Sequence, residues 1–314
     1  MRKKGSVVFI IAIAVILAVT LIVQGQKEKR QTAHMTELKE EAKPYENELT
    51  EIRMELQNMK AKINEKPETA VITIGFVPTS GDDISKIKDL FDSYTYTPLI
   101  ILDCSLEQET LMDIIAGASE NGYEMIPSGM TFDDQVLENA VQIQTFLTEY
   151  GYEGAPSFFI RKVHDSEENR KMLEDKGYHS FVRYSDALKS GITDSGSSYI
   201  TYGFVRGQSA ISGTFSQIIA AASYTVIAID FSDIENRLIS LRDVAELLQT
   251  ADEKTTSGEV QYVNMGELFQ MVADDSGKAD RLSEEYEQYE IKQQKRIEEL
   301  EEKINEIYSH WDQY

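Results

Sequence analysis

The chain has 314 residues, 27% of them charged, and a formal net charge of −23 at pH 7. Residues 67–275 hold 13 cations and 34 anions, so a net charge of −21 lies in the centre of the chain. A surface this acidic repels nucleic acids and anionic lipid head groups, and it leaves neutral polymers, cations and basic partners open. Cys104 is the single cysteine, which excludes an intrachain disulfide.

An apolar segment near the N-terminus predicts a membrane span. Arg2-Lys3-Lys4 precedes a run from Val7 to Val23 that only Thr20 interrupts. As a helix this run is about 26 Å long, close to the roughly 30 Å of a hydrocarbon core. It is longer than the apolar region of most cleaved signal peptides and lacks an A-x-A-like cleavage site, so we expect an uncleaved signal-anchor. The basic tail favours a cytoplasmic N-terminus, with the remainder of the chain outside the cell membrane.

Two segments have the alternating three- and four-residue spacing of apolar side chains that is typical of coiled coils. The first comprises Met35, Leu38, Ala42, Tyr45, Leu49, Ile52, Leu56, Met59 and Ile63, and the second Ile297, Leu300, Ile304, Ile307, Trp311 and Tyr314. Pro44 predicts either a kink in the first helix or a helix that begins near it. The two segments could pair with each other as an antiparallel stalk or each pair across a homodimer, and the spacing leaves both open.

Between these segments, strand-like and helix-like stretches alternate. Apolar, β-branched runs predict strands at 70–77, 98–102, 123–126, 157–160, 180–184, 199–205, 224–231 and 260–263. Amphipathic stretches predict helices at 84–93, 106–120, 132–150, 167–176, 214–223 and 241–251. Repeated strand–helix units predict a parallel sheet closed into an α/β barrel, with an open doubly wound sheet as the alternative. We therefore divide the chain into a tail and signal-anchor (1–26), a coiled coil (27–67), a barrel (68–275) and a second coiled coil (276–314).

Five stretches of this central region, in their order and spacing, resemble the polysaccharide deacetylase family. They are Gly122–Ser128, Phe158–Arg161, Gly177-Tyr178, Val226–Asp230 and Tyr262–Leu268. The resemblance implies a distorted (β/α) barrel and, in the family, a divalent metal held by an aspartate and two histidines.

The positions that would carry this metal depart from the family pattern. No acidic residue lies in the first strand at Thr73–Phe76, and Ser128 and Phe132 stand where the two histidines belong. Asp230 corresponds loosely to a late catalytic histidine. The resemblance therefore implies a degenerate member, with no metal or other cofactor expected.

A relocated site for a divalent metal such as zinc would have only weak candidates, namely Asp82, Asp83 and His164. The two aspartates equally suit the N-terminal cap of the helix that follows them. Cys104, at the end of an apolar strand, is expected to be a buried small side chain.

These observations predict a membrane-anchored domain of the bacterial cell envelope that binds a neutral polysaccharide or a protein partner in cell-wall or exopolysaccharide assembly, without catalysis. The candidate groove residues at the barrel mouth are Ser128, Arg161, His164, Tyr184, Tyr202 and Asp230. One alternative is an active deacetylase with a relocated metal site. Another is a structural or regulatory membrane protein whose barrel serves as a protein interface.

Overall fold

The computed structural model describes the backbone of residues 3–63, 69–129, 131–149, 156–184, 188, 190–193, 195–205 and 208–310. Side chains are described in these ranges except at 3–19, 149, 204 and 208–210. The chain divides into two compact units, one formed by Met1–Asn64 with Ala279–Tyr314 and the other by Glu65–Lys278.

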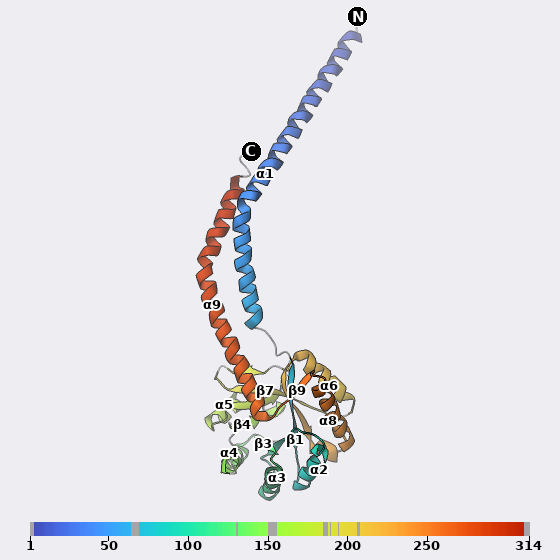
Figure 1. Ribbon diagram of the computed structural model, residues 1–314, viewed down its shortest axis with the longest axis vertical. Coiled ribbons are helices and arrows are strands. Elements are labelled where there is room, and N and C mark those ends of the chain that lie inside the picture. Colours follow the sequence, from blue (N-terminus) through green and yellow to red (C-terminus); the bar gives the residue numbers. More distant parts are fainter. Residues whose placement is uncertain are drawn as a thin grey trace. The chain divides into compact units, whose positions relative to one another are not determined.

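The first unit is a pair of antiparallel helices. Helix α1 (Lys3–Ile63) lies beside the later part of α9 (Met265–Ser309), as Figure 1 shows. Leu38 and Ala42 of α1 pack against Ile307, and further along α1 a second cluster forms around Leu300 of α9. Helix α1 continues through Pro44, so the alternative of a helix that begins near this proline is wrong. Trp311 and Tyr314, the last two residues of the predicted seam, lie outside the described residues.

Charged and hydroxyl groups flank this apolar contact. Arg296 donates two hydrogen bonds to the Glu48 carboxylate, at 2.7 and 2.8 Å, and Arg53 donates to Glu301. The Tyr308 hydroxyl donates to Glu46 at 2.9 Å. Each helix thus covers the apolar stripe of the other within one chain.

Among the described residues, no helix combines the length and the apolar composition that a membrane span requires. The predicted span from Val7 to Val23 falls mainly on residues 7–19, whose side chains lie outside the described set.

The second unit is a closed α/β barrel. Seven strands pair in parallel around it in the order β1-β2-β3-β4-β5-β7-β8, and β8 returns to β1. The strands are β1 (Ala70–Val77), β2 (Leu99–Asp103), β3 (Glu124–Ser128), β4 (Ser157–Phe159), β5 (Ser180–Tyr184), β7 (Ser198–Phe204) and β8 (Tyr224–Asp230). This pairing confirms the predicted barrel over the open sheet. Each of these strands agrees with its prediction to within two residues at either end.

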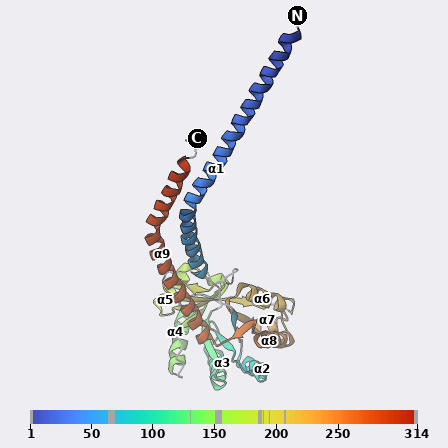
Figure 2. The same ribbon diagram turned by 45° about the horizontal axis from the view of Figure 1, so that its top comes forward.

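Helices cover the outside of the barrel. They are α2 (Gly81–Phe91), α3 (Gln108–Glu120), α4 (Asp134–Glu149), α5 (Glu167–Asp175), α6 (Gln208–Ala221), α7 (Phe231–Glu235) and α8 (Leu241–Thr256). Helix α3 lies between α2 and α4 in both views (Figures 1 and 2). Among the described residues, three short elements were not predicted from the sequence. They are α7, the 3-10 helix η1 (Lys162–His164) and the strand β6 (Gly191–Ile192), which pairs antiparallel with β7.

The short strand β9 (Val260–Tyr262) distorts the barrel beside β1. Strand β9 pairs with the first half of β1, at Ala70–Ile72, whereas β2 pairs with β1 only at Gly75 and Phe76. The gap between β1 and β2 at their N-terminal ends is therefore filled by β9.

Strand residues alternate between the barrel interior and the helix layer. Ile72, Ile74 and Phe76 belong to the core shared with the helices, whereas Val71 and Val77 belong to the inner core. Residues from the start of α9, among them Met265 and Leu268, join the inner core. Because both faces of each strand are buried, the strands are near-continuous apolar runs, which is why they were visible in the sequence.

Two glycines end helices. Gly122 follows α3 with φ +67°, and Gly177 follows α5 with φ +92°, a left-handed conformation that costs other residues about 1–2 kcal/mol. The tyrosines after them, Tyr123 and Tyr178, are buried. Both Gly-Tyr pairs thus have a local structural reason, independent of any family resemblance.

Candidate functional site

The six candidate groove residues lie near the C-terminal ends of barrel strands. Ser128, Tyr184 and Asp230 are the last residues of β3, β5 and β8, and Arg161 follows β4. In parallel strands these ends form one edge of the barrel, where such folds place their binding sites. The structure therefore brings the predicted residues to one end of the barrel.

Arg161 and Asp230 form an ion pair at this mouth. The Arg161 guanidinium donates to Asp230 Oδ2 at 3.2 Å, and the two side chains are 13% and 9% exposed. Asp230 Oδ1 accepts from the backbone N–H and the hydroxyl of Ser232, so Asp230 is the N-cap of α7. The Asp230 carboxylate is thus used on both oxygens.

Ser128 and Tyr202 are buried. The Ser128 hydroxyl donates to the carbonyl oxygen of Phe159 at 3.0 Å, and the Tyr202 hydroxyl accepts from the backbone N–H of Lys162 at 2.8 Å. Burial raises the pKa of Tyr202 to about 12. The Tyr202 ring packs on Phe159 with 4.3 Å between ring centroids. In this structure both side chains serve as packing and hydrogen-bonding groups within the protein.

Tyr184 and His164 are half-buried, as is Arg161. The Lys162 ammonium lies 3.8 Å from the centroid of the Tyr184 ring, a distance typical of a cation–π contact. The His164 ring lies 6.2 Å from the Phe132 ring.

One of the weak metal candidates, Asp83, has other partners. The Asp83 carboxylate accepts from the backbone N–H groups of Thr79 and Ser80 and lies 2.7 Å from the Lys86 ammonium. Burial raises the pKa of Asp83, but the hydrogen bonds from Lys86 and Thr79 outweigh it and hold the pKa below its usual value. A lysine ammonium in direct contact opposes a bound cation. Asp83 is therefore a helix-capping group, as the sequence predicted in the alternative to a metal ligand.

Two further positions bear on the metal question. Asp82 is exposed, and Phe132, at one of the positions that the resemblance assigns to histidine, has no metal-binding atom. Within the described part of the chain, no three His, Cys, Asp or Glu side chains form a group able to hold a metal ion.

Cys104 is buried, as expected. Burial raises the pKa of its thiol to about 12, so the nucleophilic thiolate is scarce at neutral pH.

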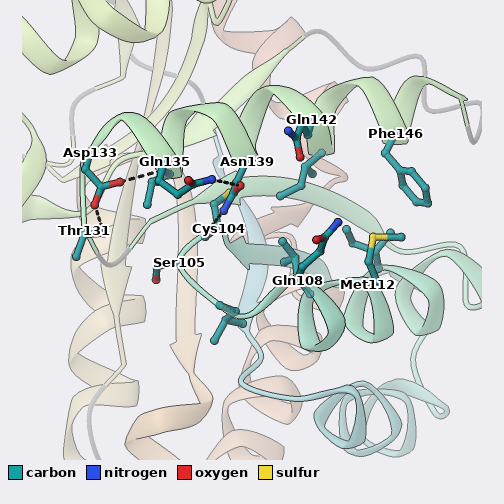
Figure 3. A pocket seen from close by; sticks show the side chains of 15 residues that line it. Cys104, Ser105, Gln108, Met112, Thr131, Asp133, Gln135, Asn139, Gln142 and Phe146 are labelled. Carbon is teal, nitrogen blue, oxygen red and sulfur yellow. Dashed lines mark hydrogen bonds between the residues drawn. The ribbon is translucent and has the colours of Figure 1, made fainter.

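A groove between α3 and α4 was not predicted from the sequence. Its volume is about 750 Å³, within the range of small-ligand sites. Figure 3 shows Gln108 and Met112 of α3 facing Gln142 and Phe146 of α4. The signal available in the sequence was the row Gln135, Asn139, Gln142 and Phe146, whose helical spacing places uncharged polar and aromatic groups along one stripe of α4.

No family model matches the chain, and no curated protein matches it. Two solved structures are similar in fold. One is a truncated 3-deoxy-D-arabino-heptulosonate 7-phosphate synthase from Thermotoga maritima, with 12% identity over 62% of this chain and 90% of that chain, at a TM-score of 0.41. The other is the Xyl-CE4 domain of a multidomain xylanase from the hindgut metagenome of Trinervitermes trinervoides, with 14% identity over 65% of this chain and 91% of that chain, at a TM-score of 0.37. Similarity at this level carries no inference about activity.

Proposed function

We propose that this chain is a membrane-anchored barrel of the polysaccharide deacetylase type that binds a neutral glycan without hydrolysing it, in bacterial cell-wall or exopolysaccharide assembly. The observation that carries the proposal is the ion pair between Arg161 and Asp230 at the barrel mouth. Asp230 stands where the resemblance places a late catalytic histidine, and its two oxygens bind Arg161 and the first turn of α7. A carboxylate held in this way is a structural group rather than a free base.

The two positions assigned to metal-binding histidines support the same conclusion. Ser128 is buried and donates its hydroxyl to a backbone carbonyl, and Phe132 packs beside Phe158 and His164. Neither residue offers the imidazole nitrogen that zinc sites of this kind use.

The charge of the central region supports a neutral ligand. A net charge of −21 over residues 67–275 would repel an anionic polymer, whereas an uncharged glycan meets no such barrier. A basic protein is the other partner that this charge would admit.

The flanking segments complete the proposal. The apolar run Val7–Val23 would hold the chain in the membrane with the barrel outside the cell. The seam between α1 and α9 supports an antiparallel coiled coil within one chain, rather than a homodimer joined through these helices.

Zinc content and acetate release test the absence of catalysis. We expect the purified chain to hold far less than one zinc per molecule and to release no acetate from acetylated oligosaccharides, with or without added zinc. Stoichiometric zinc that is lost in His164→Ala or Asp83→Asn, but kept in Asp89→Asn, together with acetate release, would establish the active deacetylase instead. If the full chain binds no neutral glycan, the structural or regulatory alternative replaces the glycan-binding role.

A further inference from the structure

The groove between α3 and α4 has walls from two helices and from the loops that precede them. Fifteen residues line it. Its floor is apolar and buried, formed by Leu111 and Ile115 of α3 and by Val136 and Ile143 of α4. The groove lies on the outer, helical layer of the barrel and includes none of the six candidate residues of the mouth.

The lining is poor in charge. At the chain's average of 27% charged residues, fifteen lining residues would include about four, whereas Asp133 is the single charged member among the described residues that line the groove. Asp133 is occupied, because its carboxylate accepts from the backbone N–H of Val136 at 2.9 Å and from the Thr131 hydroxyl at 3.1 Å. A groove with one charged side chain, already hydrogen-bonded within the protein, favours an uncharged ligand in so acidic a domain.

Primary amides form the polar part of the groove. Asn139 joins α4 to the end of β2, because its amide donates to the carbonyl oxygen of Cys104 at 2.9 Å. The same amide accepts from Gln135, one turn earlier in α4, at 3.0 Å. Gln108 and Gln142 are exposed on opposite walls, and within the described residues their amides have no hydrogen-bond partner in the protein. Each amide offers both a donor and an acceptor, which is the pairing that a sugar hydroxyl requires.

Apolar side chains lie beside these amides. Met112 is 37% exposed on α3, and Phe146 is half-buried on α4. Figure 3 shows both at one end of the groove, near Gln108 and Gln142. A sugar ring has apolar C–H faces as well as a hydroxyl rim, and this combination of surfaces can contact both.

We propose that the groove between α3 and α4 is the site at which the barrel binds an uncharged oligosaccharide. Gln108 and Gln142 bind its hydroxyl groups from opposite sides, and Phe146 and Met112 contact the C–H face of a ring. This inference rests on the proposed glycan-binding function and moves its site from the barrel mouth to the helix layer.

Calorimetric titration of the full chain, in a detergent without sugar head groups, tests the site. The probes are neutral hexasaccharides of β-1,4-linked N-acetylglucosamine, β-1,4-linked glucose and β-1,3-linked glucose. We expect at least one probe to bind, with an affinity that changes less than about twofold between 50 and 500 mM salt, because no charge is paired. Affinity that falls steeply with salt would overturn the proposal.

Variants then locate the binding. Gln108→Ala combined with Gln142→Ala should weaken binding about tenfold or more, since two hydrogen-bonding groups are lost. Met112→Arg, at an exposed position, should abolish binding by filling the groove. Gln144→Ala on the same helix, outside the lining, is the matched control and should leave the affinity unchanged, and circular dichroism should show that all variants are folded.

The outcomes separate this inference from the proposed function. Binding that survives both groove changes but is lost in His164→Ala would return the site to the barrel mouth, overturning the groove while the glycan-binding function stands. Binding of no probe would overturn both.

Discussion

Arg161 and Asp230 are 69 residues apart in the chain, and their side chains meet at 3.2 Å across the mouth of the barrel. The contact joins the end of β4 to the end of β8, two strands that are not neighbours in the sheet. It therefore ties opposite parts of the mouth together.

Breaking this pair should destabilise the barrel. Arg161→Met is expected to lower the free energy of unfolding by about 3 kcal/mol, because it leaves a largely buried carboxylate without its counter-charge. Arg161→Met combined with Asp230→Asn should cost less than the sum of the two single changes, since neither charge remains. Urea unfolding of the four proteins measures the coupling; strictly additive changes would mean that the two residues do not stabilise one another.

The seam between α1 and α9 predicts a local loss of stability. Leu300 is 1% exposed and packs on Leu49 and Ile52, so Leu300→Ala should cost about 2–4 kcal/mol through the cavity that it leaves. Hydrogen exchange should accelerate in both helices of the seam and remain unchanged in the barrel strands. Ile291→Ala, at a position 77% exposed on the same helix, is the control and should leave exchange unaltered. Light scattering on the full chain should give one protein chain per particle; a stable homodimer would contradict within-chain pairing.

Asp83 predicts an acid-dependent contribution to stability. Its pKa is held below the usual value, so its contribution is present above the unfolded-state pKa of about 3.9 and is lost as the pH falls through the lower folded-state pKa. Asp83→Asn should therefore cost about 1 kcal/mol at pH 7, the typical value of a helix cap, and progressively less below about pH 4. Asp89→Asn on the exposed face of α2 is the control. A loss that is constant from pH 7 to pH 3 would contradict this role.

Glu124 predicts the opposite dependence. Burial raises the pKa of this carboxyl, although it accepts hydrogen bonds from the backbone N–H groups of Met265 and Gly266 at the start of α9. Because the pKa is raised, the contribution of the Glu124 carboxyl to stability is fully present below the unfolded-state pKa of about 4.3. This contribution is lost as the pH rises through the folded-state pKa.

Glu124→Gln should therefore be at least as stable as the parent protein at pH 7, with an advantage that disappears below about pH 4. Thermal unfolding between pH 3 and pH 8 measures the difference. Glu120→Gln, at an exposed position in the last turn of α3, is the control. A variant that is less stable than the parent only at neutral pH would show that the ionised carboxylate is the stabilising form.

Some of the candidate sites were predictable from the sequence because their chemistry is local. Asp83 lies within four residues of the groups that it binds, so its role as a helix cap followed from spacing alone. The ends of barrel strands bring Ser128, Tyr184 and Asp230 together for a similar reason, since parallel strands align their C-terminal ends. Which of these side chains are accessible was not predictable, because burial depends on contacts such as that between Tyr202 and Phe159.

The sequence by itself determined the strands and most of the helices, because a strand buried on both faces must be an apolar run and an outer helix must be amphipathic. It also determined the acidity of the central region and the two apolar seams. Only the tertiary structure decided that Leu300 packs on Leu49, because a three-and-four spacing defines a stripe but not the surface that covers it. The closure of β8 onto β1 and the groove between α3 and α4 likewise arise from contacts between separate segments of the chain. A local sequence pattern does not predict which segments will be in contact.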